Sequence, residues 1–223
     1  MTAMKKAFLV YCITFILLQT VVLGMLYAYP KLELHLMLNT CHTAIADTFF
    51  KYYTLLAEWP LYVLALLPVF WKKSRMTLFF AISELSSGAV LQTLKRLFEA
   101  DRPVSVFANY PDVTLPLVQG VDMHHSNSFP SGHASTFFVF FTCCALLLAY
   151  YYQQRANAGK PCSRLLITLS MLSLLFLAAL GAYSRVYLSQ HFMEDICVGS
   201  IIGFIVPCLV FHFFRNKILS VTD

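Results

Sequence analysis

The chain has 223 residues, of which 59% are hydrophobic and only 12% are charged, and its mean hydropathy is +0.68. Soluble domains carry about 25% charged residues, so this composition excludes an ordinary water-soluble globule. It also excludes a disordered chain and a nucleic-acid binder, whose basic surface must be solvated. The formal net charge of +5 therefore bears on membrane topology rather than on anionic partners.

Apolar runs in chain order predict an all-α integral membrane protein with six transmembrane helices, because a spanning helix needs about 20 mostly apolar residues. The first run is too long for the apolar part of a signal peptide, so we expect an uncleaved helix. The second run is short and contains Pro60 and Pro68, and it has the weakest signal of the six. The runs cover residues 7–29, 54–71, 76–97, 134–152, 164–183 and 196–214.

The distribution of Lys and Arg predicts that both termini face the cytoplasm, because cytoplasmic loops of membrane proteins are enriched in these residues. With the N-terminus inside, ten of the sixteen basic residues lie on cytoplasmic segments with one acid, and nine of the eleven acids lie on the opposite side. The ten bases are Lys5, Lys6, Lys72, Lys73, Arg75, Arg155, Lys160, Arg164, Arg215 and Lys217.

Two outer segments are too long to be simple turns. Residues 30–53 mix apolar and polar positions, which predicts a helix that lies in the membrane interface. Residues 98–130 carry Pro, Asp, Asn and His without a spanning pattern, which predicts a long outer loop. Loops of this length inside compact folds are usually functional.

Ionisable residues at the ends of apolar helices are the informative ones in a membrane protein. The first cluster is LKRLFEADRP, in which Lys95 and Arg102 lie two helical turns apart and can share one face before Pro103 ends the helix. Taken alone, such a pair is more often a membrane anchor than a site.

The second cluster is SFPSGHAST, residues 128–136, directly before the fourth apolar run. Ser131 is a candidate helix N-cap, and Gly132 permits close approach of a ligand to the backbone. The free N–H groups of the first helical turn, which includes His133, favour an anion. As a helix cap alone, the motif is unremarkable.

The third cluster is YSRVYLSQHFMEDI, residues 183–196, between the fifth and sixth runs. His191 and Asp195 are four residues apart, so a helix stacks them on one face. The carboxylate can accept the Nδ1–H of the imidazole and leave Nε2 free as a nucleophile or base. Such a pair, even with Arg185 before it, is also compatible with a structural hydrogen bond.

Together the three clusters supply fixed cations, helix-start N–H groups and two imidazoles on one side of the membrane. This set suits a phosphoryl group, because cations hold its oxygens while one His attacks in line and the other protonates the leaving oxygen. The sequence offers no carboxylate cluster for magnesium or zinc. The cations would instead neutralise the charge of the transition state.

These segments resemble the signature of the type 2 phosphatidic acid phosphatases, the PAP2 superfamily, and in particular its membrane-integrated bacterial lipid phosphatases. The family pattern is K-x6-RP, then PSGH, then SR-x5-H-x3-D, and every fixed position is matched in order. The resemblance implies a single PAP2-like transmembrane domain over residues 1–223. The matching residues are Lys95, Arg102, Pro103, Pro130, Ser131, Gly132, His133, Ser184, Arg185, His191 and Asp195.

The resemblance also implies a role for each matched residue. His191 would be the nucleophile that forms a phosphohistidine, Asp195 would hold its ring, and His133 would act first as acid and then as base. No metal or other cofactor is implied. The phosphoryl oxygens would be bound by Lys95, Arg102, Ser131, Gly132 and Arg185.

The leading hypothesis is a lipid phosphatase in a bacterial inner membrane, with its active site facing the periplasm. Its partners would be the bilayer and a phosphorylated lipid: a lipid A phosphate, undecaprenyl diphosphate or phosphatidylglycerol phosphate. Its oligomeric state is left open. A lipid phosphotransferase on the same scaffold is the alternative, because a lipid hydroxyl can intercept a phosphohistidine. A transporter is disfavoured, because the charges concentrate at one surface.

Two further features lie outside the signature. Glu84 lies inside the third apolar run, where it is either a functional acid or the partner of a hydrogen bond to a neighbouring helix. Gly199 and Gly203 form a G-x-x-x-G pattern, which favours close helix packing over dimerisation.

Overall fold

The computed structural model describes residues 2–68, 74–161 and 163–219, and within these ranges the chain is all-helical. Five of its helices belong to segments long and apolar enough to cross a membrane. The protein is therefore a multi-pass helical membrane protein. The five helices are α1 (Ala3–Ala28), α5 (Ser74–Phe98), α7 (Gly132–Asn157), α8 (Arg164–Tyr187) and α9 (Met193–Leu219).

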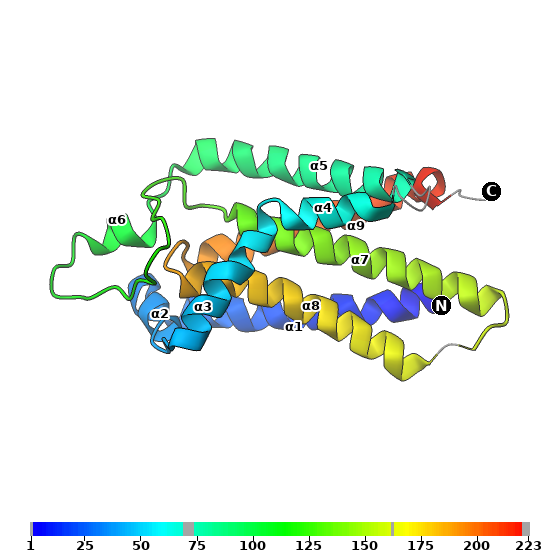
Figure 1. Ribbon diagram of the computed structural model, residues 1–223, viewed down its shortest axis with the longest axis horizontal. Coiled ribbons are helices and arrows are strands. Elements are labelled where there is room, and N and C mark those ends of the chain that lie inside the picture. Colours follow the sequence, from blue (N-terminus) through cyan, green and yellow to red (C-terminus); the bar gives the residue numbers. More distant parts are fainter. Residues whose placement is uncertain (1, 69–73, 162, 220–223) are drawn as a thin grey trace.

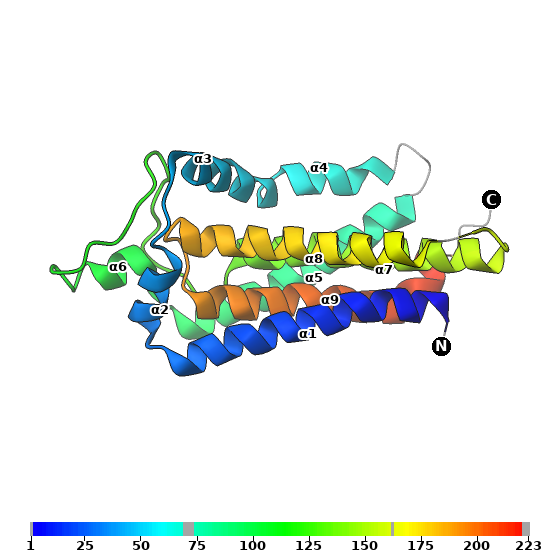
Figure 2. The same cartoon turned by 90° about the horizontal axis from the view of Figure 1, so that it is seen from below.

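The second apolar run, of which residues 69–71 lie outside the described residues, forms a 3-10 turn and a short helix over 54–68 rather than one long helix. The helix α3 (Ala44–Tyr53), the 3-10 turn η1 (Thr54–Ala57) and the helix α4 (Pro60–Leu66) follow one another along the side of the bundle (Figure 2). Pro60 stands at the first position of α4, where its missing N–H breaks no intrahelical bond. Six helices were predicted, whereas five described segments have the length and hydropathy of a span.

The predicted outer segments gather at one end of the bundle. Residues 30–53 form two helices rather than one, α2 (Lys31–Leu38) at the bundle end and α3 running back along it (Figures 1 and 2). The long loop over 98–130 holds one short helix, α6 (Pro103–Phe107). The N-terminus and the end of α9 lie at the opposite end (Figure 1).

The helix α7 forms the centre of the bundle and packs against α1, α5, α8 and α9. A Cβ atom at Gly199 or Gly203 of α9 would collide with the backbone oxygen of Ser131 or Ser135 of α7. The G-x-x-x-G pattern therefore serves packing within the chain, and the absence of side chains brings the start of α9 against the start of α7.

Candidate active site

The three polar clusters meet at the end of the bundle that carries α2 and α6, because α5 and α8 end there and α7 and α9 begin there (Figure 1). Backbone hydrogen bonds join the clusters to one another. The Ser131 N–H donates to the Asp195 carbonyl oxygen at 3.0 Å, and the Ser128 N–H donates to the Ala100 carbonyl oxygen at 2.8 Å. Residues far apart in the sequence thus form one site.

His191 and Asp195 form a buried pair, with 3.3 Å between Nδ1 and Oδ2. The same carboxylate oxygen accepts the Phe192 N–H at 2.9 Å and the hydroxyl of Ser128. These donors hold the carboxylate in place, so it can accept Nδ1–H and orient the ring. No hydrogen bond joins Nε2 to any residue that the structure describes, which leaves this nitrogen available for chemistry.

The surroundings of His191 favour its neutral form. Burial, and then the positive charges of Arg185, Arg102 and Lys95, hold the pKa of this imidazole well below its usual range. A neutral imidazole has a free lone pair on one nitrogen. His191 is therefore in the nucleophilic form at neutral pH.

Arg102 and Arg185 approach each other through a shared acceptor. The side-chain oxygen of Gln190 accepts from Arg102 Nη1 at 3.1 Å and from Arg185 Nη2 at 3.4 Å. Arg102 Nε also donates to the Ser126 carbonyl oxygen at 2.9 Å, and Arg185 Nη1 donates to the Thr54 hydroxyl at 2.9 Å. All of these acceptors are neutral.

Within the described ranges, neither arginine forms a salt bridge, and neither does Lys95, whose ammonium donates to the Asn127 carbonyl oxygen. Arg185 is only 6% exposed, and its Nε atom has no hydrogen-bond partner. Buried charges are ordinarily paired, because an unpaired one carries a large desolvation cost. Three cations at one place, none of them in a direct salt bridge with a described residue, are the arrangement expected of an anion site.

The start of α7 adds backbone donors to this site. The Ser131 side chain caps the helix by accepting the Ala134 N–H at 3.4 Å. The first N–H groups of an α-helix have no intrahelical acceptor. A Cβ at Gly132 would meet no atom within 4 Å, so there is open space beside this backbone.

His133 lies in the first turn of α7, and its Nε2 atom is 3.9 Å from Oε1 of Glu58. That distance is too long for a hydrogen bond, and Nε2 is buried without any partner. Glu58 lies between η1 and α4, in the second apolar run. It is a neighbour of His133 that the sequence did not indicate.

Each segment that carries the site contains a non-glycine residue with a left-handed backbone conformation. Glu99, Asn127 and Ser189 have φ values of 39°, 56° and 51°, and no other described non-glycine residue has a positive φ. Each lies within a few residues of Lys95, Ser128 or His191. Strained conformations of this kind persist where the surrounding structure holds them, and they concentrate at functional sites.

Sequence reasoning missed the residues that hold the site in place. Ser128 and Gln190 lie in the second and third clusters, but their partners, Asp195 and the two arginines, are set by the tertiary fold. Thr54, which binds Arg185, lies in a segment predicted to be a membrane helix. In the described part of the chain, no three His, Cys, Asp or Glu side chains gather as ligands for a metal ion.

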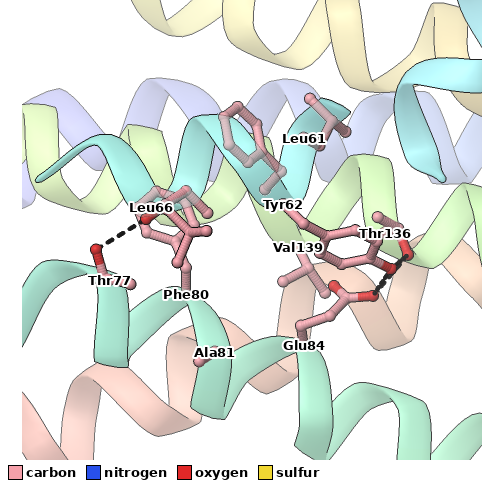
Figure 3. Close-up of a pocket in the computed structure, with 11 residues that line it drawn as sticks. Leu61, Tyr62, Leu66, Thr77, Phe80, Ala81, Glu84, Thr136 and Val139 are labelled. Carbon is pink, nitrogen blue, oxygen red and sulfur yellow. Dashed lines mark hydrogen bonds between the residues drawn. The ribbon is translucent and has the colours of Figure 1, made fainter. Parts of the chain in front are cut away.

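A pocket of about 160 Å³ lies beside the site between α4, α5 and α7 (Figure 3). The Tyr62 hydroxyl and the Thr136 hydroxyl both donate to Oε1 of Glu84, at 3.1 and 2.6 Å. Glu84 therefore does bond to neighbouring helices, as one of its two interpretations predicted, and it also lines a pocket. Its other neighbours there are mostly apolar, among them Leu61, Leu66, Phe80 and Val139.

The fold and the site define a multi-pass membrane protein with a cluster of cations and a His–Asp pair at one end of its bundle. Residues 76–219 match the family model of the PAP2 superfamily. The match covers more than half of the chain, so the protein belongs to this family.

Two solved structures share the fold. The first transmembrane PAP2 type phosphatidylglycerolphosphate phosphatase from Bacillus subtilis superposes with a TM-score of 0.63 at 19% identity, over 94% of this chain and 98% of that one. Aquifex aeolicus LpxE superposes with a TM-score of 0.58 at 22% identity, over 83% of this chain and 97% of that one. No curated protein sequence matches the chain.

Proposed function

We propose that the protein is a membrane lipid phosphatase that works without a metal ion. The observation that carries this proposal is a set of three cations, Lys95, Arg102 and Arg185. They form no direct salt bridge with any described residue, and they lie close enough to His191 to lower its pKa. Membership of the PAP2 superfamily and a structural neighbour that is a phosphatidylglycerolphosphate phosphatase support the same activity.

In the proposed first step, Nε2 of His191 attacks phosphorus in line with the bond to the leaving oxygen. The new P–N bond forms as the P–O bond breaks, and His133 donates a proton to the leaving oxygen. Asp195 stabilises the imidazolium that develops on His191. The phosphoryl oxygens are held by Lys95, Arg102, Arg185, the Ser131 side chain and the Gly132 N–H.

In the second step, water attacks the phosphohistidine while His133 takes the proton of that water. The P–N bond breaks, and phosphate leaves with His191 restored. The lysine and arginine side chains offset the charge that builds up on phosphorus in both steps, as preorganised electrostatic groups do.

The proposed topology has six passes, with α3, η1 and α4 together making the second as a broken helix. Both termini would be cytoplasmic, and the site would face the periplasm across a bacterial inner membrane. Two observations support this orientation: the chain ends lie opposite the site (Figure 1), and Lys5, Lys6 and Arg215 belong to the helices that begin or end there. The whole of 1–223 would act as one domain.

The substrate class is a phosphorylated membrane lipid, with a lipid A phosphate, undecaprenyl diphosphate and phosphatidylglycerol phosphate as candidates. We expect the purified protein in detergent to release phosphate from at least one of these lipids in the presence of a metal chelator. The His191→Ala protein serves as the blank, and its melting temperature is compared with that of the wild-type protein to show that it is folded. Equal release by this variant, or a strict requirement for added metal, would overturn the proposal.

A further inference from the structure

Only one of the two carboxyl oxygens of Glu84 forms hydrogen bonds with the described residues. Its Oε1 atom accepts both hydroxyl hydrogen bonds, whereas Oε2 has none with any residue in the described ranges. The group lines an otherwise mostly apolar pocket between α4, α5 and α7 (Figure 3). Polar groups of this kind inside membrane segments are costly and are candidates for function.

The pocket lies one helical turn from the candidate site, toward the middle of the bundle. Glu58 faces His133 at 3.9 Å, and one turn further along the same two segments Tyr62 faces Thr136 at 3.4 Å. Three residues of α-helix advance the chain by about 4.5 Å. The carboxyl of Glu84, bonded to Thr136, therefore lies about that much deeper than His133.

The pocket is also accessible from the side of the bundle. Tyr62 and Leu66 of α4 are 42% and 52% exposed, and Leu85, next to Glu84, is 74% exposed. In a membrane these surfaces meet lipid chains. A lipid whose phosphate occupies the cation cluster would place the atoms that follow the phosphate beside this pocket.

We propose that Glu84 is a specificity residue for acyl lipids, a proposal that rests on the phosphatase function above. In this mostly apolar pocket the carboxyl is protonated, and its Oε2–H donates a hydrogen bond to the oxygen of an ester, amide or hydroxyl group that follows the phosphate by a few atoms, as in glycerolipids and acylated sugar lipids. A polyprenyl phosphate has only hydrocarbon at that depth. It would leave the carboxyl unpaired, and sites built to bond a polar group discriminate strongly against analogues that lack it.

A purely structural role for Glu84 makes a different prediction. If the carboxyl only braces α4 and α7 against α5, its removal lowers activity on every substrate alike. Tyr62→Phe is the matched control, because it deletes one of these bracing hydrogen bonds and leaves the carboxyl in place. Glu84→Gln keeps the shape of the side chain, an oxygen that accepts the two hydroxyl hydrogen bonds, and an N–H donor in place of Oε2–H.

The test compares three substrates in detergent: a diacylglycerol phosphate, a polyprenyl phosphate and a short water-soluble phosphate monoester. For Glu84→Leu we expect kcat/KM to fall about tenfold on the diacyl lipid, mainly through KM, and to change less than about twofold on the other two. Glu84→Gln and Tyr62→Phe keep most of the preference for the diacyl lipid. The melting temperature of each variant shows whether it is folded.

An equal loss on all three substrates, or an unchanged diacyl preference in folded Glu84→Leu, would overturn this proposal. If Glu84→Leu fails to fold, Glu84→Ala takes its place, and an unchanged ratio between diacyl and polyprenyl substrates in folded Glu84→Ala refutes the proposal. Failure of the phosphatase assignment is recognised separately, because His191→Ala would then retain activity on all three substrates.

Discussion

Arg102 and Arg185 donate hydrogen bonds to the same atom, the side-chain oxygen of Gln190, at 3.1 and 3.4 Å. Two guanidinium groups repel each other, and here a neutral amide rather than a carboxylate holds them together. A carboxylate at this position would satisfy both charges within the protein. Because no carboxylate pairs directly with the two arginines in the described residues, their charge remains available to the substrate phosphate, at a cost in stability.

This relationship predicts that Gln190→Glu weakens the binding of phosphate. The new carboxylate pairs with both arginines and competes with phosphate, so we expect KM to rise about tenfold or more. The gain in stability from this pairing is offset, because the carboxylate cannot replace the hydrogen bond that Gln190 Nε2 donates to the Asp122 carbonyl oxygen at 2.9 Å. Gln119→Glu, at an exposed position of the outer loop over 98–130, is the control for added negative charge. A Gln190→Glu protein with unchanged KM would show that the two arginines do not bind the phosphate.

Ser128→Ala tests how the His–Asp pair is held. The Ser128 hydroxyl donates to the Asp195 oxygen that faces His191. Without it the carboxylate loses one of its fixed donors, and we expect kcat to fall about tenfold with little change in KM. Ser126→Ala should leave kcat unchanged, because Ser126 is exposed and its hydrogen bond with Arg102 uses the backbone oxygen. Equal activity of the two variants would contradict this role for Ser128.

The pH dependence of kcat/KM follows from the charges around His191. Its pKa is lowered by burial and by three cations, so the neutral nucleophile persists below pH 6.5 and the acid limb of the profile lies there. Replacing Lys95 by Gln removes one of these charges, which raises the pKa and moves the acid limb to higher pH. Wild type and Lys95→Gln are assayed on the same substrate, so the ionisation of the substrate affects both pH profiles equally and does not contribute to the shift between them. A limb that stays in place or moves to lower pH contradicts the account.

Gly199→Ala tests the contact that brings the two helix starts together. The added Cβ would collide with the Ser131 backbone oxygen, so α9 must move away from α7. We expect the free energy of unfolding to fall by about 1–3 kcal/mol, with a loss of activity because His191 shifts relative to His133. Gly88→Ala on α5 is the control, since its Cβ would meet no atom within 4 Å. Denaturation in detergent and phosphate release measure the two effects, and equal stability of both variants contradicts this packing.

Much of the architecture could be predicted because hydrophobic length and local motifs are properties of the sequence itself. The long apolar runs became α1, α5, α7, α8 and α9, and the signature positions fall at or near their ends. The predicted shared helix faces were wrong, because α5 ends before Arg102 and α9 begins after His191. Residues 30–53 were harder, because the chain turns between α2 and α3. Asn39, at the end of α2, donates to the Ser189 hydroxyl, and Thr43 caps α3. Both roles depend on tertiary position.

The supporting residues of the site could not be predicted for the same reason. Thr54 binds Arg185 only because the second apolar run breaks into a 3-10 turn beside the end of α8. Pro60 in this run marks the residue at which α4 begins. No residue pattern in the run predicted the 3-10 turn that precedes this proline. The two interpretations of Glu84 were visible in the sequence, whereas the pocket that it lines exists only in the packed bundle.

The most direct test of the proposed mechanism is to trap phosphate on the enzyme. The protein is mixed briefly with a substrate lipid that carries labelled phosphate and is then denatured in alkali, where phosphohistidine is preserved. We predict label on the peptide that contains His191 in the wild-type protein and none in His191→Ala. Steady release of phosphate by wild type with no labelled His191, or label retained in His191→Ala, would contradict the account.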